Sequence, residues 1–457
     1  MSDTGEKTHR SPEATVSADV VETVAYGLPV VWLVVLILLY GTLSPVWRLT
    51  GATVCLLFVI KVSSYLILRA RRGDYSLSKV QWLLYWTVWP GVRPDLFAGV
   101  ASEGEEFAEP EGRNFVVGYA YVLLGAALVV ASVLSPLFVG GRVGSWILLF
   151  GLLAVFHMGV GRILPFGLRW LGYPVPPLFD SPLKSRGVGD FWSARWNYPF
   201  INMNRLFITG PLSARVGIGG AALVAFVVSG ALHEMAISYP AAAGWGLPFA
   251  YFVVQGIAYT AEKTVFPGLE EHTVLGRVWT YVVVFAPLPL LFHGTFRATF
   301  LVPPIEWAHG VLLTYPLSTY MGAGLWIGAA GHFLVLAASF QVPKQLDWDT
   351  DLESLQPLNR KLMWTYGGFI VLTIVSFGVL TAVFHGQFVA GTPLALGLCA
   401  MVAVFWSARI LVDTFYFSHD DWPEGVEFVV GHALLTSLFL LLVVIYGGTV
   451  VFHLVLA

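Results

Sequence analysis

The chain has 457 residues, of which 57% are hydrophobic and 12% are charged, and its mean hydropathy is +0.74. Soluble domains carry roughly 25% charged residues, so this composition excludes a soluble globular enzyme, a secreted disulfide scaffold and a nucleic-acid-binding module. The formal net charge of −3 carries little information, because in a membrane protein the positions of Lys and Arg matter more than their sum.

Residues 1–26 form a polar, acidic N-terminal segment without the short basic stretch and apolar core of a signal peptide. Its low hydrophobicity predicts a disordered tail. The two cysteines, Cys55 and Cys399, both fall inside apolar runs. Neither is placed for a structural disulfide or for a metal site of the CxxC type.

Apolar runs of about 20 residues recur along the rest of the chain, and each is long enough to cross the ~30 Å hydrocarbon core of a bilayer. We therefore predict an all-α polytopic membrane protein, integral and multi-pass, with about eleven transmembrane helices. The expected spans are residues 28–46, 50–70, 115–137, 146–165, 215–237, 244–263, 278–300, 320–342, 364–385, 393–412 and 427–453. Residues 82–90 are too short and aromatic for a span and predict an interfacial or re-entrant element.

The distribution of Lys and Arg tests this arrangement independently, because cytoplasmic loops are enriched in both. If the N-terminus is inside, the outer connections hold only Arg48 and Arg142. The inner connections hold most of the others, concentrated in residues 69–113 and 169–205. We therefore predict a cytoplasmic N-terminus and, with an odd number of helices, a C-terminus outside.

Two modules are expected on either side of Pro303-Pro304. Residues 27–302 contain most of the polar signals and form the first module. Residues 320–457 are expected to form a second module of four helices, whose role the sequence does not define.

The longest connection between expected spans contains the run Asp190-Phe-Trp-Ser-Ala-Arg-Trp-Asn197. Aromatic rings beside Arg195 and Asn197 can hold a polar group at the level of the lipid headgroups. The alternative is an interfacial aromatic belt in which Arg195 extends its charge into water. The same connection is basic, and such a surface suits the phosphates of an anion; its cations are Lys184, Arg186, Arg195 and Arg205.

The expected span at 215–237 contains Ser229-Gly-Ala-Leu-His-Glu234, which places His233 in or near the hydrocarbon. Polar residues there are costly and call for a function or a partner. An imidazole can act as a general base near neutral pH, or it can bond a neighbouring helix. Ser229 shares the helix face of His233, whereas Glu234 points about 100° away. A helix that starts at Arg215 puts His233 ~27 Å from the cytoplasmic end, so a tilt, a start near Gly219 or an inward loop is needed to bring the base to the aromatic motif.

The two motifs, in this order and about 35 residues apart, resemble the paired signature of wax synthases, which are long-chain-alcohol fatty acyltransferases of the membrane-bound O-acyltransferase superfamily. The stretches Trp89-Pro-Gly-Val-Arg-Pro94 and Phe179-Asp-Ser-Pro182 support the resemblance, which covers roughly residues 80–300. The family pattern usually reads Phe-Trp-Gly-Arg-Arg-Trp, whereas Ser193 and Ala194 occupy the third and fourth places here. This departure leaves the acceptor open more than the chemistry.

The resemblance implies transfer of a fatty acyl group from acyl-CoA to a hydroxyl acceptor, with a long-chain alcohol as the first expectation. His233 matches the family's intramembrane histidine and Asn197 its polar partner, and these two are the expected catalytic residues. The expected substrate-binding residues are Asp190, Trp192, Arg195, Trp196, Ser229 and Glu234. The expected partners are acyl-CoA as co-substrate, a hydroxyl-bearing lipid and the membrane lipid, with no further cofactor, no metal and no nucleic acid.

Two alternatives remain at this stage. The acceptor can be a sterol, diacylglycerol, a polyketide or a sugar alcohol, or the intramembrane polar residues can line the path of a transporter. The pairs His157 with Arg162 and His293 with Arg297 can line the same cavity or simply bond each other and the interface. In the second module, His332 and His432 can face one another as metal or haem ligands, although packing and hydrogen bonding are the favoured interpretation.

Overall fold

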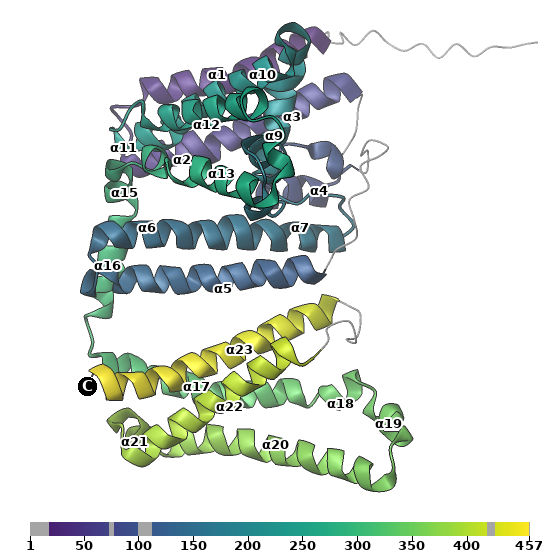
Figure 1. Ribbon diagram of the computed structural model, residues 1–457, viewed down its shortest axis with the longest axis vertical. Coiled ribbons are helices and arrows are strands. Elements are labelled where there is room, and N and C mark those ends of the chain that lie inside the picture. Colours follow the sequence, from purple (N-terminus) through teal and green to yellow (C-terminus); the bar gives the residue numbers. More distant parts are fainter. Residues whose placement is uncertain (1–17, 73–76, 99–111, 418–425, 457) are drawn as a thin grey trace, which may run out of the picture. The chain divides into compact units, whose positions relative to one another are not determined.

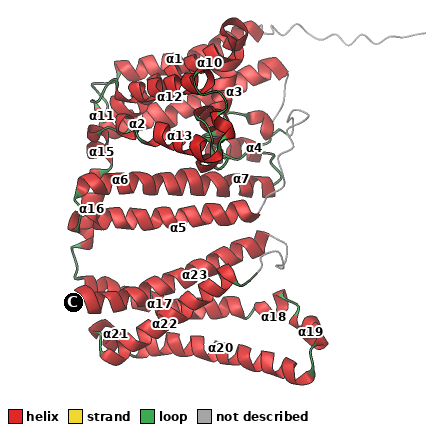
Figure 2. Cartoon of the chain, viewed as in Figure 1, coloured by secondary structure: helices red, strands yellow, loops and turns green. Residues whose placement is uncertain are grey.

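The computed structural model describes residues 18–72, 77–98, 112–417 and 426–456. Every regular element in these ranges is helical (Figure 2), which confirms the predicted all-α fold. The chain divides into two compact units, residues 1–306 and residues 307–457. The division falls within α16 (Val302–Leu312), and the roles predicted for the two modules stay predictions.

Ten helical segments in the described part of the chain are long and apolar enough to cross a membrane. The protein is therefore an integral, multi-pass membrane protein, as predicted, and these ten helices compare with the expected count of about eleven. The expected span at 244–263 forms α12 (Leu247–Thr264), which is not among the ten. Gln255, Glu262 and Lys263 lower the hydropathy of this helix.

Unit 1 combines long helices with short, irregular ones (Figure 1). Its longer helices are α1 (Ala18–Leu38), α3 (Leu56–Arg72), α5 (Gly112–Leu134), α6 (Gly141–Leu152), α7 (Gly161–Trp170), α10 (Gly210–His233), α12 and α13 (Thr273–Phe285). The shorter ones are α2 (Pro45–Thr50), α4 (Lys79–Leu83), α8 (Val188–Asp190), α9 (Tyr198–Asn204), α11 (Tyr239–Ala241), α14 (Leu288–Leu291) and α15 (Gly294–Phe300). Six π-helical segments interrupt them: η1 (Gly51–Cys55), η2 (Leu84–Val88), η5 (Leu153–Val160), η7 (Phe191–Arg195), η8 (Arg205–Thr209) and η9 (Glu234–Ser238).

The first helix begins earlier than the sequence predicted. Residues 1–17 of the predicted disordered tail lie outside the described residues, but residues 18–26 are helical and belong to α1. The carboxylate of Glu22 accepts two hydrogen bonds of 2.9 Å from Arg71 on α3. Asp19 also lies in the first helical turn, where a negative charge is favourable. These interactions explain why polar residues extend the helix here.

The predicted interfacial or re-entrant element at residues 82–90 is a short helical segment packed into unit 1. A capping box starts α4, since Ser78 and Gln81 exchange side-chain-to-backbone hydrogen bonds. Tyr85 is fully buried, and the ammonium group of the buried Lys61 donates to the carbonyl oxygens of Tyr85 and, at 2.5 Å, of Trp89. A cation inside α3 thus satisfies the carbonyls at the end of a short helix.

Unit 2 is built on four long helices around one apolar core. These are α17 (Leu317–Ser339), α20 (Pro357–Val383), α22 (Pro393–Phe415) and α23 (Val426–Val451), joined in part by α18 (Val342–Gln345), α19 (Trp348–Asp351) and α21 (His385–Ala390). The π-helical η13 (Phe452–Leu456) follows α23. Cys399 lies in the core, and both cysteines are free thiols.

His332 and His432, the two histidines of unit 2 that the sequence singled out, each have a partner of their own. His332 is fully buried, with Nδ1 2.8 Å from the carbonyl oxygen of Gly328, and its Nε2 accepts a hydrogen bond of 3.1 Å from Trp406. His432 lies 3.2 Å from a carboxylate oxygen of Asp413. These contacts fit the packing and hydrogen-bonding interpretation rather than a pair of facing ligands.

Candidate active site

The aromatic motif forms a π-helical turn that is held by hydrogen bonds between its own residues and those directly before it. It starts in α8 and continues through η7, where the Ser193 hydroxyl donates to the carbonyl oxygen of Gly189 at 2.6 Å. The carboxylate of Asp190 accepts from Nε of Arg195 at 2.8 Å and from the amide of Arg186 at 3.2 Å. Two of the expected substrate-binding residues, Asp190 and Arg195, therefore bind each other and fix the turn.

Helix α12 anchors this turn through two buried polar side chains. Glu262 accepts from the amides of Val188 at 2.6 Å and Gly189 at 3.3 Å. Gln255 accepts from the indole Nε1 of Trp192 at 3.1 Å and donates to a carbonyl of α13 at 2.8 Å. The two anchors are seven residues apart and so share one face of the helix. Sequence reasoning missed them, although two polar residues at this spacing in an apolar helix are a usable signal.

Asn197 has the contacts of a helix cap. Its backbone is left-handed, with φ of 55°, and its side-chain oxygen accepts from the amide of Phe200 at 3.2 Å at the start of α9. Asn is one of the few non-glycine residues that adopts this conformation readily. The catalytic role expected for Asn197 stays a prediction, and the observed interaction is structural.

Trp196 lies in an aromatic cluster. Its ring stacks on Phe191 at 5.3 Å and on His157 at 5.5 Å between centroids, and it meets Phe179 edge-on at 5.1 Å. Arg162 bonds Asn114 and Ser181, so the predicted pair of His157 and Arg162 separates into two environments. The cluster joins the motif to η5.

A break in α10 shortens the helical stretch that leads to His233. Gly217 has φ of 74° and ψ of 168°, so the helix that leads to His233 starts at about Ile218. This is close to the later start, near Gly219, that the sequence offered as one way to bring the base nearer. Sixteen residues then separate the break from His233, or about 24 Å of rise.

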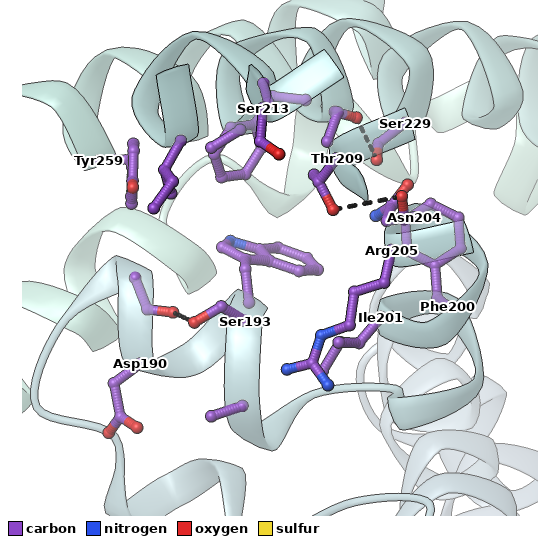
Figure 3. Close-up of a pocket in the computed structure, with 18 of the residues that line it drawn as sticks. Asp190, Ser193, Phe200, Ile201, Asn204, Arg205, Thr209, Ser213, Ser229 and Tyr259 are labelled. Carbon is purple, nitrogen blue, oxygen red and sulfur yellow. Dashed lines mark hydrogen bonds between the residues drawn. The ribbon is translucent and has the colours of Figure 1, made fainter. Parts of the chain in front are cut away.

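A cavity of about 770 Å³ lies between the motif, η8, α10 and α12 (Figure 3). Of the expected site residues, Asp190, Trp192 and Ser229 line it. The other described residues that line it include Arg186, Ser193, Ala194, Phe200, Ile201, Asn204, Arg205, Thr209, Ser213, Ile218, Ala221, Ala222, Ala225, Phe226, Phe252, Tyr259, Lys263 and Glu270. Arg195, Trp196, Asn197, His233 and Glu234 are not among the described lining residues.

The cavity is charged at one end and apolar along α10. Lys263 forms an ion pair with Glu270, and Arg205 extends into the open part of the pocket beside Ile201 (Figure 3). Within the described chain the Arg205 side chain has no ion pair or hydrogen bond. Asn204, which sequence reasoning also missed, lines the cavity with a buried side-chain oxygen that has no hydrogen-bond partner in the described part of the structure.

His233 stands at the apolar end of the cavity and touches two of its walls. Its Nδ1 lies 2.7 Å from the carbonyl oxygen of Ser229, and its ring lies 4.4 Å from that of Phe252. A carbonyl oxygen only accepts, so Nδ1 carries the hydrogen and Nε2 keeps a free lone pair in the neutral ring. His233 is thus oriented with its basic nitrogen away from the helix bond.

Glu234 points to a different element. One of its carboxylate oxygens accepts from the amides of Gly246 and Phe249, both at 2.9 Å. These amides belong to the start of α12, where a negative charge is favourable. Glu234 therefore joins the end of α10 to the beginning of α12, and the substrate-binding role expected for it stays a prediction.

The architecture is that of a polytopic membrane protein with an oriented histidine beside a partly charged cavity. Residues 175–254, which include both motifs and much of the cavity wall, match the Membrane bound O-acyl transferase family. A long-chain-alcohol O-fatty-acyltransferase of Simmondsia chinensis is 31% identical over 118 residues, covering 24% of this chain and 32% of that protein. The chain therefore matches about a third of the length of this relative. No solved structure matches the chain. The resemblance to wax synthase-like membrane-bound O-acyltransferases is confirmed by these matches.

Proposed function

We propose that the chain is an O-acyltransferase that moves a fatty acyl group from acyl-CoA to the hydroxyl of a long-chain alcohol. One observation carries the proposal: a cavity with charged residues at one end reaches two residues, Ser229 and Phe252, that hold the ring of His233. This arrangement suits a donor with a charged headgroup and an apolar chain that must meet a base inside the bundle. The match of residues 175–254 to the acyltransferase family supports the same chemistry.

In the proposed reaction the alcohol oxygen attacks the thioester carbonyl carbon while Nε2 of His233 takes the hydroxyl proton. The carbon–sulfur bond then breaks, and the proton passes from His233 to the leaving thiolate. The products are the ester and free coenzyme A, and no covalent acyl-enzyme is required. A positioned general base of this kind contributes typically 10²- to 10⁴-fold to the rate.

The charged end of the cavity is the proposed site for the coenzyme A headgroup. The guanidinium of Arg205 is free to bind a phosphate, and charge-assisted bonds of this type are about twice as strong as neutral ones. Arg186 and Lys263 also line the cavity, and Lys263 is paired with Glu270. The buried side-chain oxygen of Asn204 is available to an amide N–H of the pantetheine arm.

The acyl chain is proposed to lie along the apolar side of α10. Ala221, Ala222 and Ala225 leave room on this face of the helix. Burial of a methylene is worth about 0.8 kcal/mol relative to water, but a chain that is already dissolved in lipid gains much less. Affinity for the donor therefore depends mainly on the headgroup.

The acceptor is the least constrained part of the proposal. Ser193 and Ala194 line the cavity where the family pattern usually has Gly and Arg, so the wall is smaller and less charged at the fourth place. The alternative, in which the same chemistry acts on another hydroxyl such as a sterol, diacylglycerol, a polyketide or a sugar alcohol, rests on this difference.

The test is ester formation by the purified chain in lipid nanodiscs with radiolabelled acyl-CoA and a panel of these acceptors, beside a reaction without acceptor. We expect labelled ester with a long-chain alcohol above the level of the other acceptors. Ester with a different acceptor alone would correct the acceptor and keep the chemistry. A chain that is folded and forms no ester with any member of the panel would contradict the proposal.

A further inference from the structure

Helices α10 and α12 run antiparallel, so their successive contacts show how the groups around His233 are arranged along the two helices. Phe226 on α10 contacts Tyr259 on α12 beside the cavity, and His233 contacts Phe252. Closer to the start of α12, Phe249 packs on Gly230, and Glu234 bonds the amides of Gly246 and Phe249. His233 therefore lies between the cavity and a second set of polar groups at the far ends of the two helices.

The first of these groups is the second oxygen of Glu234. The first oxygen is committed to two amides of α12, whereas Oε2 is buried and has no hydrogen-bond partner among the described residues. A buried carboxylate oxygen without a donor costs free energy. A ligand that donates a hydrogen bond to Oε2 of Glu234 would remove this cost.

The second group is the imidazole of His293, of which only 4% is exposed. Its Nδ1 accepts from the amide of Phe296 at 3.2 Å and caps α15, so Nε2 carries the hydrogen of the neutral ring. Within the described structure this buried Nε2 has no hydrogen-bond partner. His293 therefore offers an unused donor, and its predicted pairing with Arg297 is not formed, because Arg297 bonds Phe292, Arg142 and Ser145 instead.

The short connection of residues 242–246 contacts both Glu234 and His293. Glu234 binds the amide of Gly246, and the face of the His293 ring packs on Gly244, where a Cβ would lie 2.4 Å from Nε2 and 2.5 Å from two ring carbons. Ala242, Gly244 and Gly246 all have positive φ, which fixes a tight path that few side chains tolerate. The hydroxyl of Ser238 adds a bond of 3.2 Å to the carbonyl of Gly244.

We propose that Oε2 of Glu234 and Nε2 of His293 form a recognition site for the hydroxyl group of the acceptor alcohol, on the side of His233 away from the cavity. A hydroxyl is both a donor and an acceptor, so it can donate to Glu234 and accept from His293 at once. A lipid without a hydroxyl cannot satisfy the carboxylate. The site therefore selects an alcohol before its oxygen reaches His233, and this inference rests on the proposed function.

Two substitutions separate the two halves of the site while keeping their structural bonds. In Glu234→Gln the amide oxygen still accepts from Gly246 and Phe249, so the amide nitrogen replaces Oε2 and presents a donor in place of an acceptor. In His293→Asn the side-chain oxygen still caps α15, because Asn is a favoured N-cap, and the Nε2 donor is lost.

The experiment measures binding without turnover. Labelled hexadecanol is bound to the purified full-length chain and displaced by unlabelled hexadecanol or by hexadecyl methyl ether, which accepts a hydrogen bond but cannot donate one. We expect the alcohol to compete about tenfold more effectively than the ether, the size of one hydrogen bond to a charged group. Glu234→Gln should bring the two competitors within about twofold, whereas His293→Asn should weaken both alike and keep their ratio.

Equal competition by alcohol and ether in the wild-type chain would overturn the site without any variant. A ratio that survives Glu234→Gln would also overturn it. Water shares the chemistry of a hydroxyl, so hydrolysis of acyl-CoA without acceptor is measured in parallel; a change there, with the alcohol-to-ether ratio intact, would assign the site to water and refute the alcohol. A wild-type chain that shows the preference but forms no ester would support this site and contradict the proposed function instead.

Discussion

Unit 1 contains six π-helical segments among its described residues, whereas the described part of unit 2 contains one, at Phe452–Leu456. A π-turn inserts an extra residue into a helix and is frequent at functional sites. Three of the six, η7, η8 and η9, surround the cavity or follow His233 directly. The irregular helices of unit 1 therefore orient side chains at the cavity, whereas the regular helices of unit 2 pack around one apolar core.

His233 and His332 show the same contrast at the level of one side chain. Each places Nδ1 against the carbonyl oxygen four residues earlier, at 2.7 Å and 2.8 Å. In His332 the remaining nitrogen accepts from Trp406, so its lone pair is used. Within the described residues, Nε2 of His233 makes no such bond. An identical local geometry therefore yields a structural residue in one unit and an available base in the other.

The largest expected effect is that of His233→Asn. The Asn amide can still donate to the Ser229 carbonyl, but it removes the basic nitrogen. We expect acyl transfer to fall by roughly a hundredfold or more, the low end of the range for general-base catalysis. The measurement is ester formed per folded molecule in nanodiscs.

The matched control is His332→Asn, which removes the partner of Trp406 in unit 2. It should lower thermal stability and leave turnover per folded molecule within about twofold. Near-normal ester formation by His233→Asn, or an equal loss in both variants, would remove the distinction between the two histidines.

The next effect concerns Arg205, whose charge extends into the cavity. Arg205→Gln should raise the KM for acyl-CoA about tenfold, because a charge-assisted hydrogen bond is worth about 1.5–3 kcal/mol. Arg215→Gln is the control, since Arg215 lies in the next helical segment, α10, is exposed and is not among the described lining residues. A similar KM in both variants would place the phosphates elsewhere.

A smaller effect is expected from Gln255→Leu, which leaves the indole N–H of Trp192 without its partner. We expect a loss of about 1–3 kcal/mol in stability and a severalfold lower turnover, because Trp192 lines the cavity. Thr381→Val in unit 2 breaks a bond of 2.8 Å to Tyr446 at similar burial. It should destabilise the protein comparably without lowering turnover, and a matching loss of turnover would argue against a special role for the Trp192 anchor.

The smallest effect on the chemistry is expected from removing unit 2. All the described residues that line the cavity lie before His272, so a chain that ends near Thr319 should still insert and transfer acyl groups at a measurable rate. Turnover per folded molecule of the truncated and full-length chains decides this. A well-folded truncation without activity would mean that both units build the catalytic cavity.

The sequence predicted those features that depend on local pattern. Apolar runs located the spans, and the two motifs singled out His233 and the turn at Asp190. The break at Gly217 was close to one of the predicted alternatives for the start of the helix. The expected span at 244–263 is the helix α12, whose polar residues keep it outside the ten helices that qualify by length and composition.

The remaining features depend on contacts between distant segments. Gln255 and Glu262 acquire their hydrogen-bond partners only when α12 packs against the aromatic motif, 63 to 74 residues earlier in the chain. No sequence pattern distinguishes Asn204 from other asparagines, and only the fold places its side chain in the cavity wall. The capping role of Asn197 follows from its left-handed backbone, which the motif alone does not reveal.

The anchoring of the aromatic motif by Glu262 also determines when the motif can fold during biosynthesis. The two partners of the Val188 amide bond are 74 residues apart, and a ribosome adds roughly 5–20 residues per second. Roughly 4 to 15 s therefore pass between the synthesis of the motif and the synthesis of Glu262, which anchors it. During that interval the loop must remain in a hydrated environment, because its amides have no partner that would let them enter the membrane. Closure of the site is thus a late step, which follows the synthesis of α12 rather than the synthesis of the motif itself.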